Sequence, residues 1–234
     1  MSKKKFWKFK NLANNEGELD IYGEISSSSG GWFSDGTEIT PTGFKEDLAA
    51  LGDISTLNVY VNSPGGDVFA GQAIYSMLKR NKAIVNVYVD GLAASIASVI
   101  AMAGDSIHMP SNSMMMIHNP WSFAQGNSKD FRKMADDLDK IGLSIQETYL
   151  AKAPDMKSEK LVELLDNETW LTAKECMDLG LCDVVEEEKT MAASLKDFEI
   201  LNKYKNVPKF IKFEDKTQIE NDLNKKRIEL ELEL

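Results

Sequence analysis

The chain has 234 residues, of which 43% are hydrophobic and 27% charged, and this is the composition of an ordinary globular protein with one well-filled core. Its net charge of −10 argues against a general nucleic-acid-binding surface, and no apolar run reaches the roughly 18 residues that cross a bilayer. The basic N-terminus lacks the apolar stretch of a signal peptide, and the two cysteines, Cys176 and Cys182, are too few for a disulfide framework or a metal site. We therefore expect a cytoplasmic protein with no metal, cofactor, nucleic-acid partner or membrane association.

The chain alternates between the hydrophobic patterns of strands and helices. In chain order we expect a strand at 19–25, a helix at 44–51, a strand at 57–61, a helix at 68–79, a strand at 84–89, a helix at 94–103, strands near 107 and at 114–117, helices at 128–153, 158–165 and 172–179, and a strand at 183–185. Such alternation is typical of an α/β fold built from βαβ units.

The composition changes toward both ends of the chain. The basic residues 3–10 are interpreted as a solvated tail, and residues 189–234 contain no glycine and mix charges with scattered aromatic residues. We divide the chain into an N-terminal tail (1–16), one domain (17–186) and a C-terminal appendage (187–234) that is partly disordered or docks on a partner.

Histidine is the usual base of serine acyl-transfer chemistry, because its pKa lies near neutrality. The chain has two histidines. His108 falls inside an expected strand, where a structural role is the simpler interpretation. His118 follows the expected strand at 114–117, and strand ends are where α/β folds place their working groups. His118 is therefore the candidate base, with a structural imidazole as the alternative.

Ser95 follows the segment Gly-Leu-Ala-Ala at 91–94 and is expected in the first turn of a helix, directly after a strand. The free N–H groups and the positive end of a helix dipole stabilise developing negative charge there. A serine hydroxyl still needs an adjacent base, because it is a poor nucleophile alone. Ser98 lies deeper in the same helix and is interpreted as packing. Serines in helices of small residues are more often core, so Ser95 is a candidate rather than an assignment at this point.

The segment Asn-Ser-Pro-Gly-Gly at 62–66 forms a second strand-to-helix turn. Paired glycines allow a backbone to approach a ligand closely and to direct N–H groups at an oxyanion. A plain Pro-Gly-Gly turn is the alternative. Together, however, the glycine turn, Ser95 and His118 supply an oxyanion hole, a nucleophile and a base along one edge of a sheet.

These residues resemble the proteolytic subunit of Clp proteases. The resemblance rests on Val-Asn-Ser-Pro-Gly-Gly at 61–66, Gly-Leu-Ala-Ala-Ser at 91–95, Met-Ile-His-Asn-Pro at 116–120, Trp-Leu-Thr-Ala at 170–173 and Gly-Leu-Cys-Asp at 180–183, in the family's order. It covers about residues 17 to 185. The segments at 18–25 and 168–173 resemble most the phage-encoded, Clp-like head maturation proteases.

The resemblance implies a ClpP/crotonase-like fold of repeated ββα units with a protruding handle helix, here 128–153. It implies Ser95 as nucleophile and His118 as general base, with the backbone N–H groups of Gly66 and Ile96 as the oxyanion hole. It further implies a homo-oligomeric ring, and possibly a double ring joined by the handles, whose active sites line a closed chamber.

The third member of the triad departs from the family pattern. The family places an aspartate where this chain has Glu168, and Asp166 lies two residues earlier. A buried carboxylate orients the imidazole and stabilises its protonated form. We favour Glu168 and keep Asp166 as the alternative.

The resulting prediction is a serine endopeptidase that acts on protein or peptide substrates, with phage capsid or scaffold proteins preferred. An alternative is a degradation subunit that depends on an AAA+ unfoldase, which must be another chain because no Walker-type Gly-x4-Gly-Lys-Ser/Thr is present. Two further alternatives are a crotonase-type acyl-CoA enzyme, which would need no Ser95/His118 pair, and a catalytically inactive ring scaffold.

Overall fold

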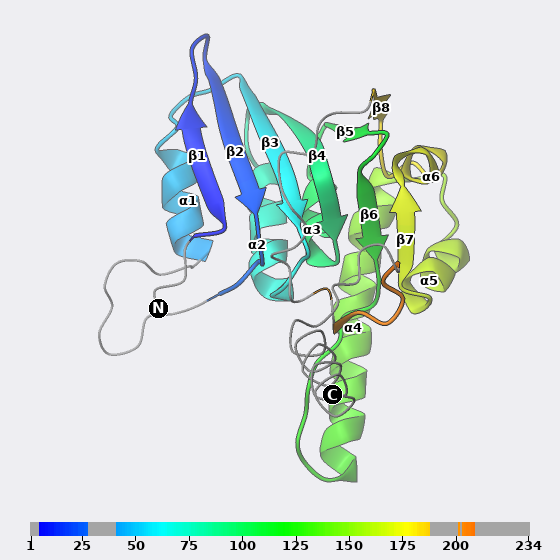
Figure 1. The fold of residues 1–234 in the computed structure, drawn as a ribbon. Coiled ribbons are helices and arrows are strands. Elements are labelled where there is room, and N and C mark those ends of the chain that lie inside the picture. Colours follow the sequence, from blue (N-terminus) through cyan, green and yellow to red (C-terminus); the bar gives the residue numbers. More distant parts are fainter. Residues whose placement is uncertain (1–4, 28–40, 188–200, 202, 209–234) are drawn as a thin grey trace, which may run out of the picture.

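The computed structural model describes residues 5–27, 41–187, 201 and 203–208. Its strands are β1 (Trp7–Asn11), β2 (Glu16–Tyr22), β3 (Thr56–Ser63), β4 (Ile84–Ala94), β5 (Ser106–Pro110), β6 (Met114–Ile117), β7 (Thr169–Thr172) and β8 (Val184–Glu186). Its helices are α1 (Pro41–Ala49), α2 (Val68–Lys79), α3 (Ile96–Ala101), α4 (Ser128–Lys152), α5 (Ser158–Asp166) and α6 (Ala173–Asp178). The expected α/β class is confirmed (Figure 1).

Within the described residues the strands form one eight-stranded sheet in the order β1-β2-β3-β4-β5-β8, and β6 and β7 branch from β4. The β1/β2 and β6/β7 pairs are antiparallel, while the other pairs are parallel. On the edge away from β3, β4 has two partners in succession: residues 86–88 pair with β5, and residues 92–94 pair with β6. Ser95 therefore directly follows the part of β4 that pairs with β6.

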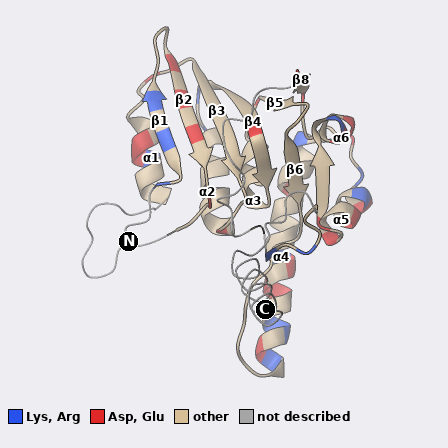
Figure 2. Ribbon diagram, in the orientation of Figure 1, with Lys and Arg blue, Asp and Glu red and all other residues tan. Residues whose placement is uncertain are grey.

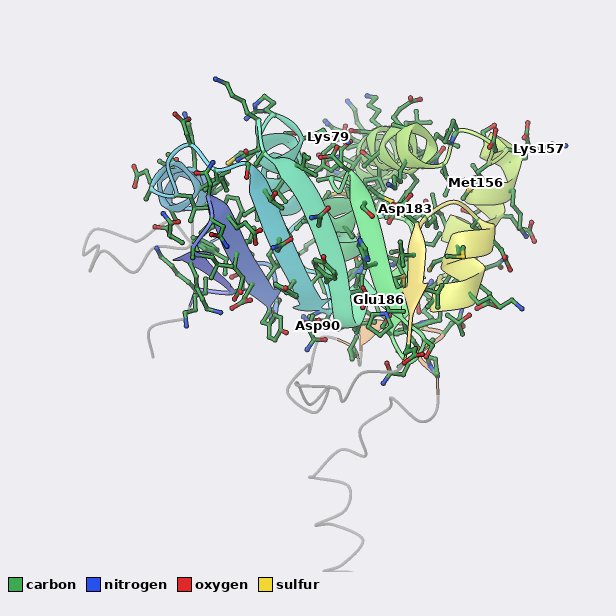
Figure 3. The ribbon with its side chains drawn as sticks, turned by 90° about the horizontal axis from the view of Figure 1, so that it is seen from above. Lys79, Asp90, Met156, Lys157, Asp183 and Glu186 are labelled. Atoms are coloured by element: carbon green, nitrogen blue, oxygen red, sulfur yellow. The ribbon has the colours of Figure 1, made fainter. Side chains whose placement is uncertain are left out.

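Side chains alternate along the central strands as a half-covered sheet requires. In β3 the odd positions Leu57, Val59 and Val61 are fully buried, whereas the even positions 56, 58 and 60 are only partly buried. Viewed from above, most helices gather on one side of the sheet (Figure 3). Charged residues concentrate on the helices and on β1 and β2, and β3 and β6 carry none (Figure 2). The buried core therefore lies between the sheet and these helices.

The N-terminal segment differs from the solvated tail expected for residues 3–10. β1 pairs with β2 along its length, and Phe6 and Trp7 are buried. Two of the lysines lie beside carboxylates: Lys10 pairs with Glu18, and Lys5 pairs with Asp47 at 2.8 Å. These two positive charges are thus matched to acidic residues of the neighbouring elements.

Two other boundaries matter for the site. The helix expected at 94–103 begins only at Ile96, because residues 91–94 continue β4. The handle helix expected at 128–153 is α4, which extends beyond the sheet (Figure 1) and is capped by the Asn127 side chain. Across the described ranges, no helix has both the length and the apolar character that crossing a membrane demands.

Candidate active site

Ser95 occupies the single-residue turn between β4 and α3, with φ 54° and ψ −128°. A residue with a side chain enters this region of positive φ at a cost of about 1–3 kcal/mol, and such strain is concentrated at functional sites. The turn is held by the Ser95 N–H, which donates to the Met116 carbonyl of β6 at 2.8 Å. The hydroxyl is thereby presented at the end of the strand instead of inside the helix.

A buried chain of hydrogen bonds from α3 and α4 supports this turn. The Ser98 hydroxyl donates to the Ser95 carbonyl at 2.5 Å, and its oxygen lies 2.6 Å from the Tyr149 hydroxyl of α4. Since Ser98 has one proton and gives it to Ser95, Tyr149 is the donor in the second bond. Ser98 is thus more than the packing residue expected. Nothing in the sequence near Ser98 points to Tyr149, because α4 approaches only through the tertiary fold.

His118 directly follows β6 and lies beside Ser95. Its Nε2 atom is 2.7 Å from the Ser95 hydroxyl oxygen, which is hydrogen-bonding distance. Burial lowers the pKa of His118 to about 4, against the opposing effect of the Glu168 charge. The imidazole is therefore neutral near pH 7 and able to accept a proton.

The glycine turn at 65–66 lies directly against Ser95. Gly65 and Gly66 have φ values of 93° and 146°, which side-chain-bearing residues rarely adopt. A Cβ atom on Gly65 would lie 2.6 Å from Ser95 Cβ and 3.3 Å from the Ile96 nitrogen, and one on Gly66 would lie 1.9 Å from the Ile25 carbonyl oxygen. Both glycines are thus required by the close approach of backbone, and the turn adjoins the N-terminus of α3.

Polar side chains of the same motif fix the glycine turn. Asn62 is buried and its side-chain oxygen accepts the Leu92 N–H at 3.2 Å, which joins the end of β3 to β4. The Ser63 hydroxyl donates to the Gly23 carbonyl at 2.7 Å and accepts the Gly65 N–H at 3.2 Å. Residues 62 and 63 therefore determine where the glycines stand.

The two candidate acids occupy different environments. Glu168 is 9% exposed, and its Oε2 atom lies 4.0 Å from His118 Nδ1, which is beyond hydrogen-bonding distance. It follows α5 with φ 48°, a second strained residue. Asp166 is exposed and instead accepts a bond from the Asn119 side chain at 2.6 Å. The structure brings Glu168, and not Asp166, toward the imidazole.

The other residues considered from the sequence lie elsewhere. His108 contacts Ser106 at 2.9 Å and Glu186 at 3.1 Å. Cys176 and Cys182 are buried, and burial raises the pKa of both thiols, which keeps them protonated. In the described part of the chain, no group of three or more His, Cys, Asp and Glu side chains is arranged to hold a metal ion.

One contact at the site comes from a residue that the sequence did not single out. Tyr204, in the appendage, places its ring 5.0 Å from the His118 ring in an edge-on arrangement. Its hydroxyl donates to the Pro64 carbonyl at 2.6 Å, next to the glycine turn. No motif marks this residue, and it lies 86 positions after His118 in the sequence.

The comparisons with known proteins agree with this geometry. Residues 46–189, more than half of the chain, match the family described as Clp protease. The chain is also 34% identical over 132 residues to the "ATP-dependent Clp protease proteolytic subunit" of Deinococcus radiodurans. That similarity covers 55% of this chain and 64% of the relative, so the chain spans somewhat less than two thirds of the relative's length.

Proposed function

Since this chain belongs to the Clp protease family, we propose that it hydrolyses peptide bonds with Ser95 as nucleophile and His118 as general base. The observation that carries the proposal is the 2.7 Å separation between the Ser95 oxygen and His118 Nε2, at a strained turn beside two glycines. A neutral imidazole at that distance can remove the hydroxyl proton as the oxygen attacks.

The reaction has two halves. Ser95 attacks the substrate carbonyl while its proton moves to His118 Nε2, and the resulting oxyanion is stabilised by the backbone N–H groups of Gly66 and Ile96. His118 then gives the proton to the leaving amine, and an acyl group remains on Ser95. Water then attacks this ester while His118 takes its proton, and His118 passes that proton to the Ser95 oxygen as the carboxylic acid product leaves, so that both residues return to their starting states.

We propose Glu168 as the acid that orients His118, with Asp166 as the alternative kept from the sequence. The proximity of Glu168 to Nδ1 and its burial support this choice. At 4.0 Å a modest side-chain rotation has to precede a direct hydrogen bond.

Fluorophosphonate labelling with peptide mapping by mass spectrometry tests the proposal. Label on Ser95 that is lost in both Ser95→Ala and His118→Ala is the expected result. Prolonged exposure of folded protein that leaves Ser95 unlabelled would contradict the proposal and favour the inactive scaffold. Binding of coenzyme A in calorimetry would instead favour the crotonase-type alternative.

We propose further that the chain assembles into a homo-oligomeric ring, and that a second ring can join it through the handle helices. Support comes from α4, which extends beyond the sheet (Figure 1) and exposes Phe131 and Leu143, whose exposed fractions are 51% and 60%. Apolar side chains on a protruding helix are suited to contact another copy. Sedimentation velocity should show a high oligomer, and a monomer at every concentration tested would contradict the assembly.

For the substrate, we propose phage capsid or scaffold proteins, on the resemblance of segments 18–25 and 168–173 to head maturation proteases. Unfoldase-dependent protein degradation is the second candidate, because the Deinococcus relative is described as ATP-dependent. Casein breakdown that requires an added AAA+ unfoldase and ATP would favour the second role. The cytoplasmic location stays a prediction.

A further inference from the structure

Part of the C-terminal appendage lies on the candidate active site of its own chain. Leu201, Tyr204 and Val207 are at most 6% exposed and pack against Leu92, Ala94 and Met116 in a small apolar cluster of their own. In Figure 1 this segment is orange and lies where β6 ends and β7 begins. Its position raises the question whether a peptide can reach Ser95 while the segment is in place.

The Tyr204 side chain takes up the space that a substrate needs. Its hydroxyl donates to the Pro64 carbonyl at 2.6 Å, next to the glycine turn, and its ring lies 5.0 Å from the His118 ring. An attacked carbonyl would have to lie about 3 Å from both Ser95 and the oxyanion donors. Tyr204 shares its apolar cluster with Ala94, the residue before Ser95, so the phenol and an attacked carbonyl would compete for the same space.

The same segment engages the candidate acid. The Asn206 N–H donates to Glu168 Oε1 at 2.6 Å, and the Asn206 side chain donates to the Asn167 carbonyl at 2.6 Å. The carboxylate is thereby held by the segment while its other oxygen stays 4.0 Å from His118. One short segment thus contacts both the proposed base and the proposed acid.

The cover also leaves one buried donor without a partner. The Trp170 indole nitrogen, beside the cluster, has no hydrogen-bond acceptor among the described residues. A buried donor without an acceptor is unfavourable. A peptide in this place could supply a backbone carbonyl to it, which favours exchange of the segment for substrate.

We propose that residues 201 and 203–207 form an intramolecular cover, so that the chain is latent until Tyr204 is displaced by a peptide substrate. The latency rests on the proposed peptidase function, whereas the covering of Ser95 and His118 by the segment can be tested without it. It makes Tyr204 a regulatory residue and not part of the catalytic machinery.

Diethyl pyrocarbonate tests access without relying on catalysis. This reagent modifies exposed neutral imidazole, and mass spectrometry gives the rates for His118 and His108 in the same molecule. In Tyr204→Ala the rate for His118 relative to His108 should rise by about tenfold or more. Tyr204→Phe keeps the ring over His118 and should raise it by less than about threefold. Equal ratios in Tyr204→Ala and the unchanged chain would overturn the cover.

A second test uses an exposed residue, so that it does not depend on a substitution in the buried cluster. Asn206 is exposed, and Asn206→Pro abolishes its N–H bond to Glu168, whereas Asn206→Ala keeps that N–H. The proline variant should open His118 to the reagent more than the alanine variant does. The same ratio in both would count against the cover even if Tyr204→Ala failed to fold.

Fluorophosphonate labelling then separates the two proposals. Faster labelling of Ser95 in Tyr204→Ala supports both. An accessible His118 with no label on Ser95 supports the cover and contradicts the peptidase. Slower labelling of a folded Tyr204→Ala chain would mean that the segment completes the site instead of covering it, and would overturn the cover.

Discussion

The two strained residues of the site, Ser95 and Glu168, are held in different ways. Ser95 is fixed by main-chain and buried side-chain bonds to β6, to Ser98 and, through Ser98, to Tyr149. Glu168 is fixed by the Asn206 N–H of the appendage, and its carboxylate stands 4.0 Å from the imidazole. The proposed nucleophile and base are therefore held in place by the sheet, whereas the proposed acid is held by a peripheral segment.

The comparison predicts that backbone changes on the Ser95 side have the largest effects. Gly66→Ala should lower the rate of Ser95 labelling by about 10²–10³ and the free energy of unfolding by about 3 kcal/mol or more, because the new Cβ would lie 1.9 Å from the Ile25 carbonyl oxygen. Labelling kinetics and urea unfolding measure the two effects.

Gly23→Ala is the matched control. Gly23 also has a positive φ, of 97°, but no atom of the described residues beyond its two chain neighbours lies within 4 Å of the added Cβ. Only backbone strain of about 1–2 kcal/mol should remain, with labelling little changed. If the two variants behaved alike, the close approach at Gly66 would not be what matters.

On the Glu168 side, charge removal should have an intermediate effect. Glu168→Gln should lower the rate of Ser95 labelling at least about tenfold, since the amide cannot stabilise the imidazolium that forms during attack. Asp166→Asn should change it less than about twofold, because Asp166 bonds Asn119 at the surface. The reverse order of the two effects would assign the acid to Asp166.

The buried imidazole predicts a pH dependence of stability. Its pKa is lowered from 6.5 to about 4 on folding, so the unfolded chain binds a proton between these values and the folded chain does not. The contribution of His118 is therefore complete above pH 6.5 and is lost as the pH falls toward 4, with a total of about 3 kcal/mol. Urea unfolding at pH 5 and 7.5 should show that the free energy of unfolding falls more at pH 5 for the unchanged chain than for His118→Gln. An equal fall in both chains would refute the prediction.

The smallest effect on stability is expected from loss of the hydrogen bond between Tyr149 and Ser98. Tyr149→Phe removes the donor to Ser98 and should cost about 1 kcal/mol of unfolding free energy. Tyr75→Phe is the control, because Tyr75 makes no hydrogen bond among the described residues and should change stability by less than about 0.5 kcal/mol. Equal losses would mean that the hydrogen bond to Ser98 contributes nothing.

The residues that sequence reasoning placed well share one property. Gly66, Ser95 and His118 each follow a strand in the continuous stretch from β3 to β6, and neighbouring strand ends meet by the rules of sheet topology. Local pattern was therefore enough to predict that they lie together. The overall α/β class followed from the same alternation.

The residues that were missed or left open depend on contacts without a local signal. Glu168 and Asp166 are two positions apart, and only the backbone turn after α5 decides which one faces the imidazole. Tyr149 and Tyr204 approach from distant elements. β1 was missed because its lysines suggest solvent, whereas their acidic partners lie on other elements.

The bond from the Ser95 N–H to the Met116 carbonyl makes the spacing of the proposed catalytic pair a matter of strand register. His118 lies two residues beyond Met116, and β4 and β6 pair residue for residue up to that point. A slip of one residue would turn His118 to the opposite face. Conservative changes in the methionine side chains of β6 should therefore leave this distance unaltered, because main-chain pairing sets it.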